Sequence, residues 1–147
     1  MIDTSNLEDP VARSQIVVTC TTSREPILGP WAFHPGLFIA AVGADNPDKQ
    51  EVHPELFARC SVVVDSIDAC ATGGDLHHAI AAGLMTRDDV HGELSAVVAG
   101  RGPGRMSPDD VFVFDSTGTA LQDVAAAVLV YERVREAPPL AVSIGAR

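Results

Sequence analysis

Four short apolar runs constrain the fold of this chain more than any other feature of its sequence. They span residues 16–20, 37–42, 61–65 and 111–115, and each is bounded by polar residues. Each run is continuous in apolar character rather than alternating, as expected of parallel strands that are covered on both faces. Segments of helical character separate the runs. The order therefore predicts an α/β fold with a parallel sheet between two helical layers.

Capping residues and helix breakers predict where the helices lie. Three short helices are expected, over residues 54–58, 76–82 and 93–99. Asp75 is expected to cap the second of these and Gly83 to end it. The clearest helix is long: it begins near Thr119, which has capping-box spacing to Gln122, and runs to about residue 136. A further short strand is a candidate at residues 140–144.

A loop rich in glycine and proline at residues 100–105 is the best candidate boundary within the chain. It predicts a sheet region over residues 1–100, followed by a last strand and a returning helix over residues 101–147. The glycines of this loop lack the Gly-x-Gly-x-x-Gly spacing, and Pro103 interrupts them. We therefore do not expect a phosphate-binding loop here.

Charge and composition exclude several classes of partner. The chain has 10 basic and 20 acidic residues, and this balance argues against a nucleic-acid partner. No apolar stretch approaches the roughly 20 residues that cross a bilayer, so no membrane partner is expected. The three cysteines show no Cys-x-x-Cys spacing, and no leader-like segment opens the chain, which favours a reducing cytoplasm. Cys20 is interpreted as a small apolar filler inside a strand.

Polar residues follow all four predicted strands. These strand ends are residues 19–23, 43–45, 65–66 and 115–118. Because the carboxyl ends of parallel strands meet at one edge of a sheet, a ligand crevice is expected there. The helix that starts after Gly118 would point its amide groups at the same edge, where they suit a carboxylate or phosphate. The alternative stays open, since turns and helix caps require the same residue types.

The histidines do not indicate a metal site. His77 and His78 are neighbours, and on a helix adjacent side chains point about 100° apart, so the two cannot easily hold one ion. The other three histidines show no ligand spacing. We expect no bound metal.

Four stretches, read together and in order, resemble the ornithine cyclodeaminase and mu-crystallin family. They are residues 17–27, 40–51, 93–105 and 114–123, and they include a Val-Gly-x-Asp motif that ends at Asp45. The resemblance implies a partial Rossmann-type parallel sheet, made of its later strands, with a long carboxyl-terminal helix. It also implies that the family's glycine-rich loop and ribose selector would precede the first residue here.

The family also implies roles for particular residues. Asp45 would be the general acid or base beside the substrate carbon, with a pKa raised by its surroundings. The implied cofactor is NAD or NADP, and the implied substrate is a small amino or imino acid that Thr117 contacts. Cofactor contacts are implied for Thr19, Ala41, Val42, Lys49 and Ser116. The family often has glycine where this chain has Asp48.

Three functional hypotheses remain open from the sequence. The first is NAD(P)-dependent chemistry, either cyclodeamination of ornithine to proline or reduction of a ketimine or imino acid. The second is a non-catalytic fragment or a crystallin-like dinucleotide-binding module. Half a Rossmann sheet exposes a strand edge, which favours a homodimer or a missing complementary chain. The third is a small doubly wound domain that binds another phosphate-bearing ligand.

Overall fold

The computed structural model describes residues 6–135, and its centre is a five-stranded sheet. All strands pair in parallel, in the order β1-β2-β5-β3-β4. The strands are β1 (Ile16–Thr19), β2 (Phe38–Ala41), β3 (Ser61–Val64), β4 (Gly92–Glu93) and β5 (Phe112–Asp115). The parallel sheet and its four predicted strands are confirmed. The candidate strand at residues 140–144 lies outside the described residues.

Six helices and two 3₁₀ turns connect the described strands. The helices are α1 (Glu8–Ala12), α2 (Pro54–Phe57), α3 (Ile67–Gly73), α4 (Asp75–Ala81), α5 (Leu94–Val98) and α6 (Ala120–Val134), and the turns are Pro30–Ala32 and Arg87–Asp89. The four predicted helices correspond to α2, α4, α5 and α6. Helix α3 was not predicted, because most of its residues are small and give no apolar periodicity. None of the described helices has the length and apolarity to cross a bilayer.

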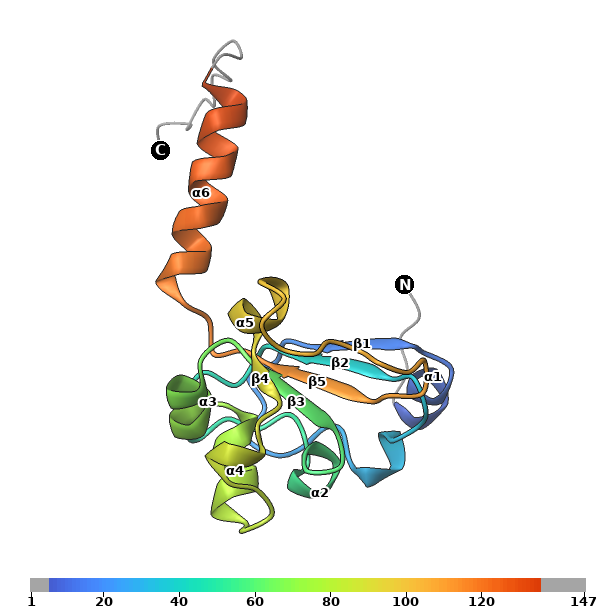
Figure 1. Cartoon of the computed structure of the whole chain (residues 1–147). Helices are drawn as coiled ribbons and strands as arrows, with labels where there is room; N and C mark the ends of the chain where they lie inside the picture. Colours follow the sequence, from blue (N-terminus) through green and yellow to red (C-terminus); the bar gives the residue numbers. More distant parts are fainter. Residues whose placement is uncertain (1–5, 136–147) are drawn as a thin grey trace, which may run out of the picture.

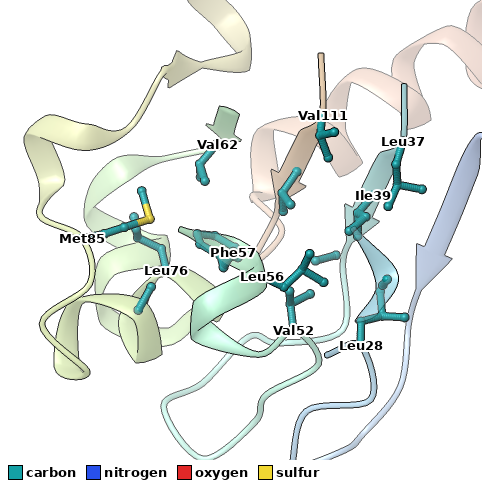
Figure 2. Close-up of a cluster of buried hydrophobic side chains, with 14 of the residues drawn as sticks. Leu28, Leu37, Ile39, Val52, Leu56, Phe57, Val62, Leu76, Met85 and Val111 are labelled. Carbon is teal, nitrogen blue, oxygen red and sulfur yellow. The ribbon is translucent and has the colours of Figure 1, made fainter. Parts of the chain in front are cut away.

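The hydrophobic core lies on one face of the sheet, beneath α2, α3 and α4 (Figure 1). Ile39, Val62 and Val113 point from three adjacent strands into this layer and are almost completely buried. Phe57 and Leu76 come from α2 and α4 to meet them (Figure 2). Burial of each such side chain contributes roughly 1.5–3 kcal/mol to folding. This layer holds the strands in register and so fixes the positions of their ends.

The opposite face of the sheet is covered where Val63 and Phe112 are buried but open over β1, which corrects the expectation of cover on both faces. Ile16 and Val18 on the edge strand are 65% and 63% exposed. Phe38 and Phe112 line an apolar pocket of about 290 Å³ that α5 and the loop at Arg105 cover in part. The physical reason is the connection between β1 and β2, which carries only a 3₁₀ turn and no helix for this face.

Helix α6 begins with the expected capping box between Thr119 and Gln122. No residue of α6 is buried, and the helix projects away from the sheet (Figure 1). Its predicted apolar face, which includes Leu121 and Val128, is therefore exposed along its length. An apolar helix face without a packing partner is a surface that is available for binding another part of a protein.

Candidate active site at the carboxyl edge of the sheet

The carboxyl ends of β1, β2 and β5 lie side by side, in the order that the sheet dictates. The amide of Val42 donates to the carbonyl of Thr19 over 3.0 Å. The amide of Ser116 donates to the carbonyl of Ala41, also over 3.0 Å. The structure thus brings together four of the residues to which cofactor contacts were assigned. Thr19 and Ala41 are buried below the surface of this edge, whereas Val42 is exposed.

An open pocket of about 560 Å³ lies at this edge. Its lining comes from the loop after β2, from α3 and from the loop after β5: Asp45, Asn46, Pro47, Asp68, Ala69, Thr72, Gly73, Thr117 and Gly118. The implied acid or base, Asp45, and the implied substrate contact, Thr117, therefore share one pocket. They are 72 residues apart in the sequence, and the parallel topology brings them together.

The Asp45 carboxylate is exposed and paired with Lys49. The Lys49 Nζ lies 2.9 Å from Asp45 Oδ1, and the side-chain amide of Asn46 donates to the same oxygen over 2.9 Å. The hydrogen bond from Lys49 holds the pKa of Asp45 below its ordinary value. The expected raised pKa is therefore not found in this chain, because apolar surroundings would be needed and Asp45 has none here.

Asp65 organises the loop after β5. The Ser116 hydroxyl donates to Asp65 Oδ2 over 2.8 Å, and the Gly118 amide donates to the same oxygen over 2.9 Å. The hydroxyl hydrogen of Ser116 is thus committed to Asp65, while its oxygen accepts from the Gly118 amide over 3.3 Å and keeps one further lone pair. Asp65 thereby fixes the turn that leads into the N-cap residue of α6, Thr119. Gly118 adopts a φ of +80°, which favours glycine.

Four carboxyl groups form a hydrogen-bonded set at the carboxyl edge of the sheet, which we call the acidic row: Glu51, Asp75, Asp115 and Asp65. The first three are at most 1% exposed. Each accepts hydrogen bonds from the backbone of another segment, and these bonds connect the row. Asp75 Oδ1 accepts from the amides of Glu51 and Val52, and the two Asp115 oxygens accept from the amides of Asp75 and Leu76. Cys70 joins the last two members, because its thiol contacts both Asp65 and the Asp115 carbonyl.

Glu51 ties β1 to β2. Its Oε2 accepts from the Thr19 hydroxyl over 2.7 Å and from the Gly43 amide over 2.9 Å. Its Oε1 accepts from the Thr21 amide over 2.6 Å. Within the described part of the chain no lysine, arginine or histidine forms an ion pair with Glu51. The buried carboxyl group is therefore satisfied by hydrogen-bond donors alone, and these come from two different segments of the chain.

Burial shifts the two central members of the row toward their protonated forms. Burial raises the pKa of Asp75 to about 6 and the pKa of Asp115 to about 7, and the neighbouring charge of Asp75 adds to the second shift. Asp75 Oδ2 is buried and has no hydrogen-bond partner among the described residues. The expectation that Asp75 caps α4 is wrong. Gly74 occupies the cap position, because the Asp75 side chain turns away from its own helix to Glu51 and Val52.

Sequence reasoning did not identify the acidic row. The sequence marks Asp65 and Asp115 only as polar strand ends and Asp75 only as a helix cap, and Glu51 stands out only within a stretch that resembles the family. The signal is weak because the contacts are long-range: the Thr19 and Glu51 side chains are 32 residues apart, and those of Ser116 and Asp65 are 51 apart. A local pattern cannot reveal such pairs.

The cysteine and histidine side chains do not form part of the candidate active site. Cys20 is exposed just beyond β1, so its interpretation as an apolar filler is wrong, because Thr19 occupies the inward position. His77 and His78 bond to the carbonyls of Ala71 and Lys49 and thus fix the backbone. Across residues 6–135 no group of three or more potential ligands is placed to hold a metal ion.

Comparison with known proteins extends these observations. The family model described as the ornithine cyclodeaminase/mu-crystallin family matches residues 3–138. The iminosuccinate reductase of Paracoccus denitrificans, solved in complex with NAD⁺, is 41% identical with a TM-score of 0.82; the match covers 88% of this chain and 40% of that one. An archaeal alanine dehydrogenase dimer with bound NAD is 34% identical with a TM-score of 0.82, over 96% of this chain and 44% of that one.

A third solved structure shows the same fold. The Δ¹-pyrroline-2-carboxylate reductase of Thermococcus litoralis, in complex with NADH and L-proline, is 28% identical with a TM-score of 0.84. The match covers 90% of this chain and 42% of that one. The chain spans about two fifths of the length of the relatives that it matches. The part that it shares with them contains the whole strand-end edge described above.

Proposed function

Because the chain belongs to the ornithine cyclodeaminase/mu-crystallin family, we propose that it forms the nicotinamide side of an NAD(P)-dependent site for a small amino or imino acid. The observation that carries the proposal is the open pocket at the carboxyl edge, which Asp45 and Thr117 both line. Parallel α/β sheets bind their ligands at this edge. The family members solved with NAD⁺ or NADH support the choice of cofactor.

The described residues fit one end of the cofactor. The pocket is lined by Asp45 and Asp68, which pair with Lys49 and Arg87, and its lining includes no lysine or arginine that would hold a pyrophosphate. A Cβ added at Gly118 would meet no atom within 4 Å, so the backbone is open to a flat ring. Bound NAD(P) would supply hydride exchange with the substrate carbon that carries nitrogen. The pyrophosphate would be held by another part of a longer protein, where the family has its glycine-rich loop.

Each site residue then has a defined task. Asp45, which Lys49 keeps ionised, can accept a proton at its free carboxylate oxygen and attract an ammonium or iminium group. The remaining lone pair of the Ser116 oxygen would accept a hydrogen bond from the cofactor, and Thr117 would orient the substrate. Thr19 and Ala41, buried at the ends of β1 and β2, would lie beneath the cofactor. Val42 would present an apolar surface to one side of the ring and exclude water there.

The same site suits two reactions. In reduction, an imino acid gains hydride and a proton and becomes an amino acid; in cyclodeamination, an amino acid is oxidised, cyclises with loss of ammonia and regains the hydride. The three solved relatives act on, or are named for, alanine, iminosuccinate and pyrroline carboxylate, which favours reductive or dehydrogenase chemistry. Ornithine cyclodeamination stays as the lyase alternative.

The second candidate function is a non-catalytic fragment or dinucleotide-binding module. Three observations favour it: the open sheet face, the exposed edge of β1 and the unpacked α6. In a longer or assembled protein, residues 1–100 would supply the cofactor domain, and residues 101–147 would supply its last strand and a helix of a second domain. The partner would be a second copy or a complementary chain. The three free cysteines suit a reducing cytoplasm.

The test is calorimetric titration of the purified chain with NAD and with NADP, alongside its mass by sedimentation. We expect binding that Ser116→Ala weakens roughly three- to tenfold, because one hydrogen bond is lost. Ser95→Ala, at an exposed position on α5, is the matched control and should bind like the original chain. Absence of binding to either dinucleotide, or equal loss in both variants, would contradict the proposal.

A further inference from the structure

We propose that Glu51 is a positioning residue, which sets the separation of the loops that follow β1 and β2 and so shapes the cofactor end of the pocket. The inference rests on the proposed function. Glu51 itself does not line the pocket, and none of its side chain is exposed. It acts through the backbone amides and the hydroxyl that it holds.

The geometry of the Glu51 carboxylate supports this role. Its two oxygens accept from Thr21 and Gly43, which belong to the two different loops, and from Thr19 at the end of β1. Beyond β1 and β2 the sheet hydrogen bonds end at the Val42 amide, so the carboxylate bridges the loops where the ladder no longer does. Asp45 lies two residues after Gly43. The position of the implied acid or base therefore depends on this bridge.

Two further features show that the chain is built around the carboxylate. A Cβ at Gly43 would collide with the Glu51 carboxyl group and would lie 2.6 Å from the Thr21 amide nitrogen. Only glycine leaves room for the bridge. The backbone of Glu51 is itself fixed, because its amide and that of Val52 both donate to Asp75 Oδ1. Through the hydrogen bonds of the acidic row, the positions of the loops after β1 and β2 therefore depend on the positions of β5 and α4.

Glu51→Gln is the decisive variant. Glutamine has one accepting oxygen and one donating amino group, so it cannot accept from three donors and would place a donor against a donor. Amide hydrogen exchange should then become about tenfold faster or more at Thr21 and Gly43, while the amides of β2 and β5 keep their protection. Glu55→Gln, at an exposed position in the first turn of α2, is the matched control. It should change the exchange rates of neither group of amides.

A second variant keeps the proposal testable if Glu51→Gln does not fold. Thr19→Val removes one donor and keeps the charge and both amide bonds, so it should give a smaller change in exchange at the same two amides. Titration with NAD, carried out on each folded variant, should show weaker binding for Glu51→Gln than for Glu55→Gln. Thr19→Val is judged by exchange alone, because Thr19 is itself an implied cofactor contact.

The outcomes separate this inference from the function on which it rests. Local loss of protection together with weaker NAD binding supports it. Unchanged exchange at Thr21 and Gly43, a uniform loss across the sheet, or local loss with unchanged NAD affinity overturns it. If the original chain binds no NAD while Glu51→Gln still shows the local loss, the proposed function fails and the bridging of the two loops stands.

Discussion

Gly43 and Gly74 each stand where a carboxylate passes close to the backbone. A Cβ on Gly74 would lie 2.6 Å from Asp115 Oδ2, and one on Gly43 would meet Glu51. Neither glycine has a positive φ, so conformational freedom is not the reason for either. The reason is space: a buried carboxyl group must reach amide donors, and a side chain at these positions would block it.

The raised pKa values of Asp75 and Asp115 predict how stability depends on pH. The ordinary value is 3.8, and in the folded chain these carboxyl groups titrate at about 6 and about 7. The folded state therefore binds their protons more tightly than the unfolded state. The stability gained in this way is fully present below pH 3.8 and is lost as pH rises through 6 and 7.

Asp75→Asn tests this linkage, because asparagine mimics the protonated carboxyl group. In urea unfolding, the original chain should lose roughly 1–3 kcal/mol between pH 5 and pH 7.5, and the variant should lose clearly less. The asparagine oxygen can still accept from the amides of Glu51 and Val52, so folding is expected to persist. If the free energy of unfolding fell equally with pH in the two proteins, Asp75 would not be the group that carries the proton.

At this scale the sequence predicts candidate residues at the strand ends but not the groups that hold their loops in place. Asp45, Thr117 and Ser116 stand out as candidates because they occur in short motifs at strand ends, and their roles stay predictions. The partners that hold the loops are not, since hydrogen bonds such as that from Thr19 to Glu51 join distant segments. The exposure of Asp45 was also beyond prediction, because it depends on what covers the pocket.

Among the elements, the strands could be predicted because each is one short apolar run between polar ends. Helix α6 could be predicted from its capping box, which is a local signal. By contrast, β4 has two residues and α3 has mostly small ones, so neither gives a pattern. The uncovered sheet face could not be predicted, because continuous apolar strands indicate burial without showing which segment provides it.

Helix α6 should be energetically independent of the sheet. Ala126→Pro, in the middle of the helix, should cost about 3 kcal/mol within α6 and reduce the helical signal in circular dichroism. Urea unfolding followed by the fluorescence of Trp31, the single tryptophan, should not change, since no α6 residue is buried. Ala126→Gln, a good helix former, is the control. A shifted Trp31 transition in the proline variant would show that α6 packs on the sheet.

For the whole molecule, the open face and the free edge of β1 predict association. Val18 is 63% exposed on the edge strand, beside the apolar pocket face. Val18→Lys should shift the sedimentation distribution toward the single chain, because a charge on an edge strand opposes edge pairing and apolar contact.

The matched control for this experiment is Leu84→Lys. It adds the same charge at another exposed apolar residue, in the segment after α4 and away from the open face. The control should leave the mass distribution unchanged. If both lysine variants dissociate the protein equally, general charge repulsion rather than the β1 edge governs its association.

The position of Cys20 has a practical chemical consequence. Burial raises the pKa of the Cys60 thiol to about 12 and holds that of the Cys70 thiol higher still, so both remain unreactive thiols near neutral pH. Cys20 is the exposed cysteine, and it follows Thr19 at the same sheet edge as the pocket. A maleimide dye would therefore attach at Cys20 without any change to the sequence. A change in its emission would report the binding of a ligand at that edge of the sheet.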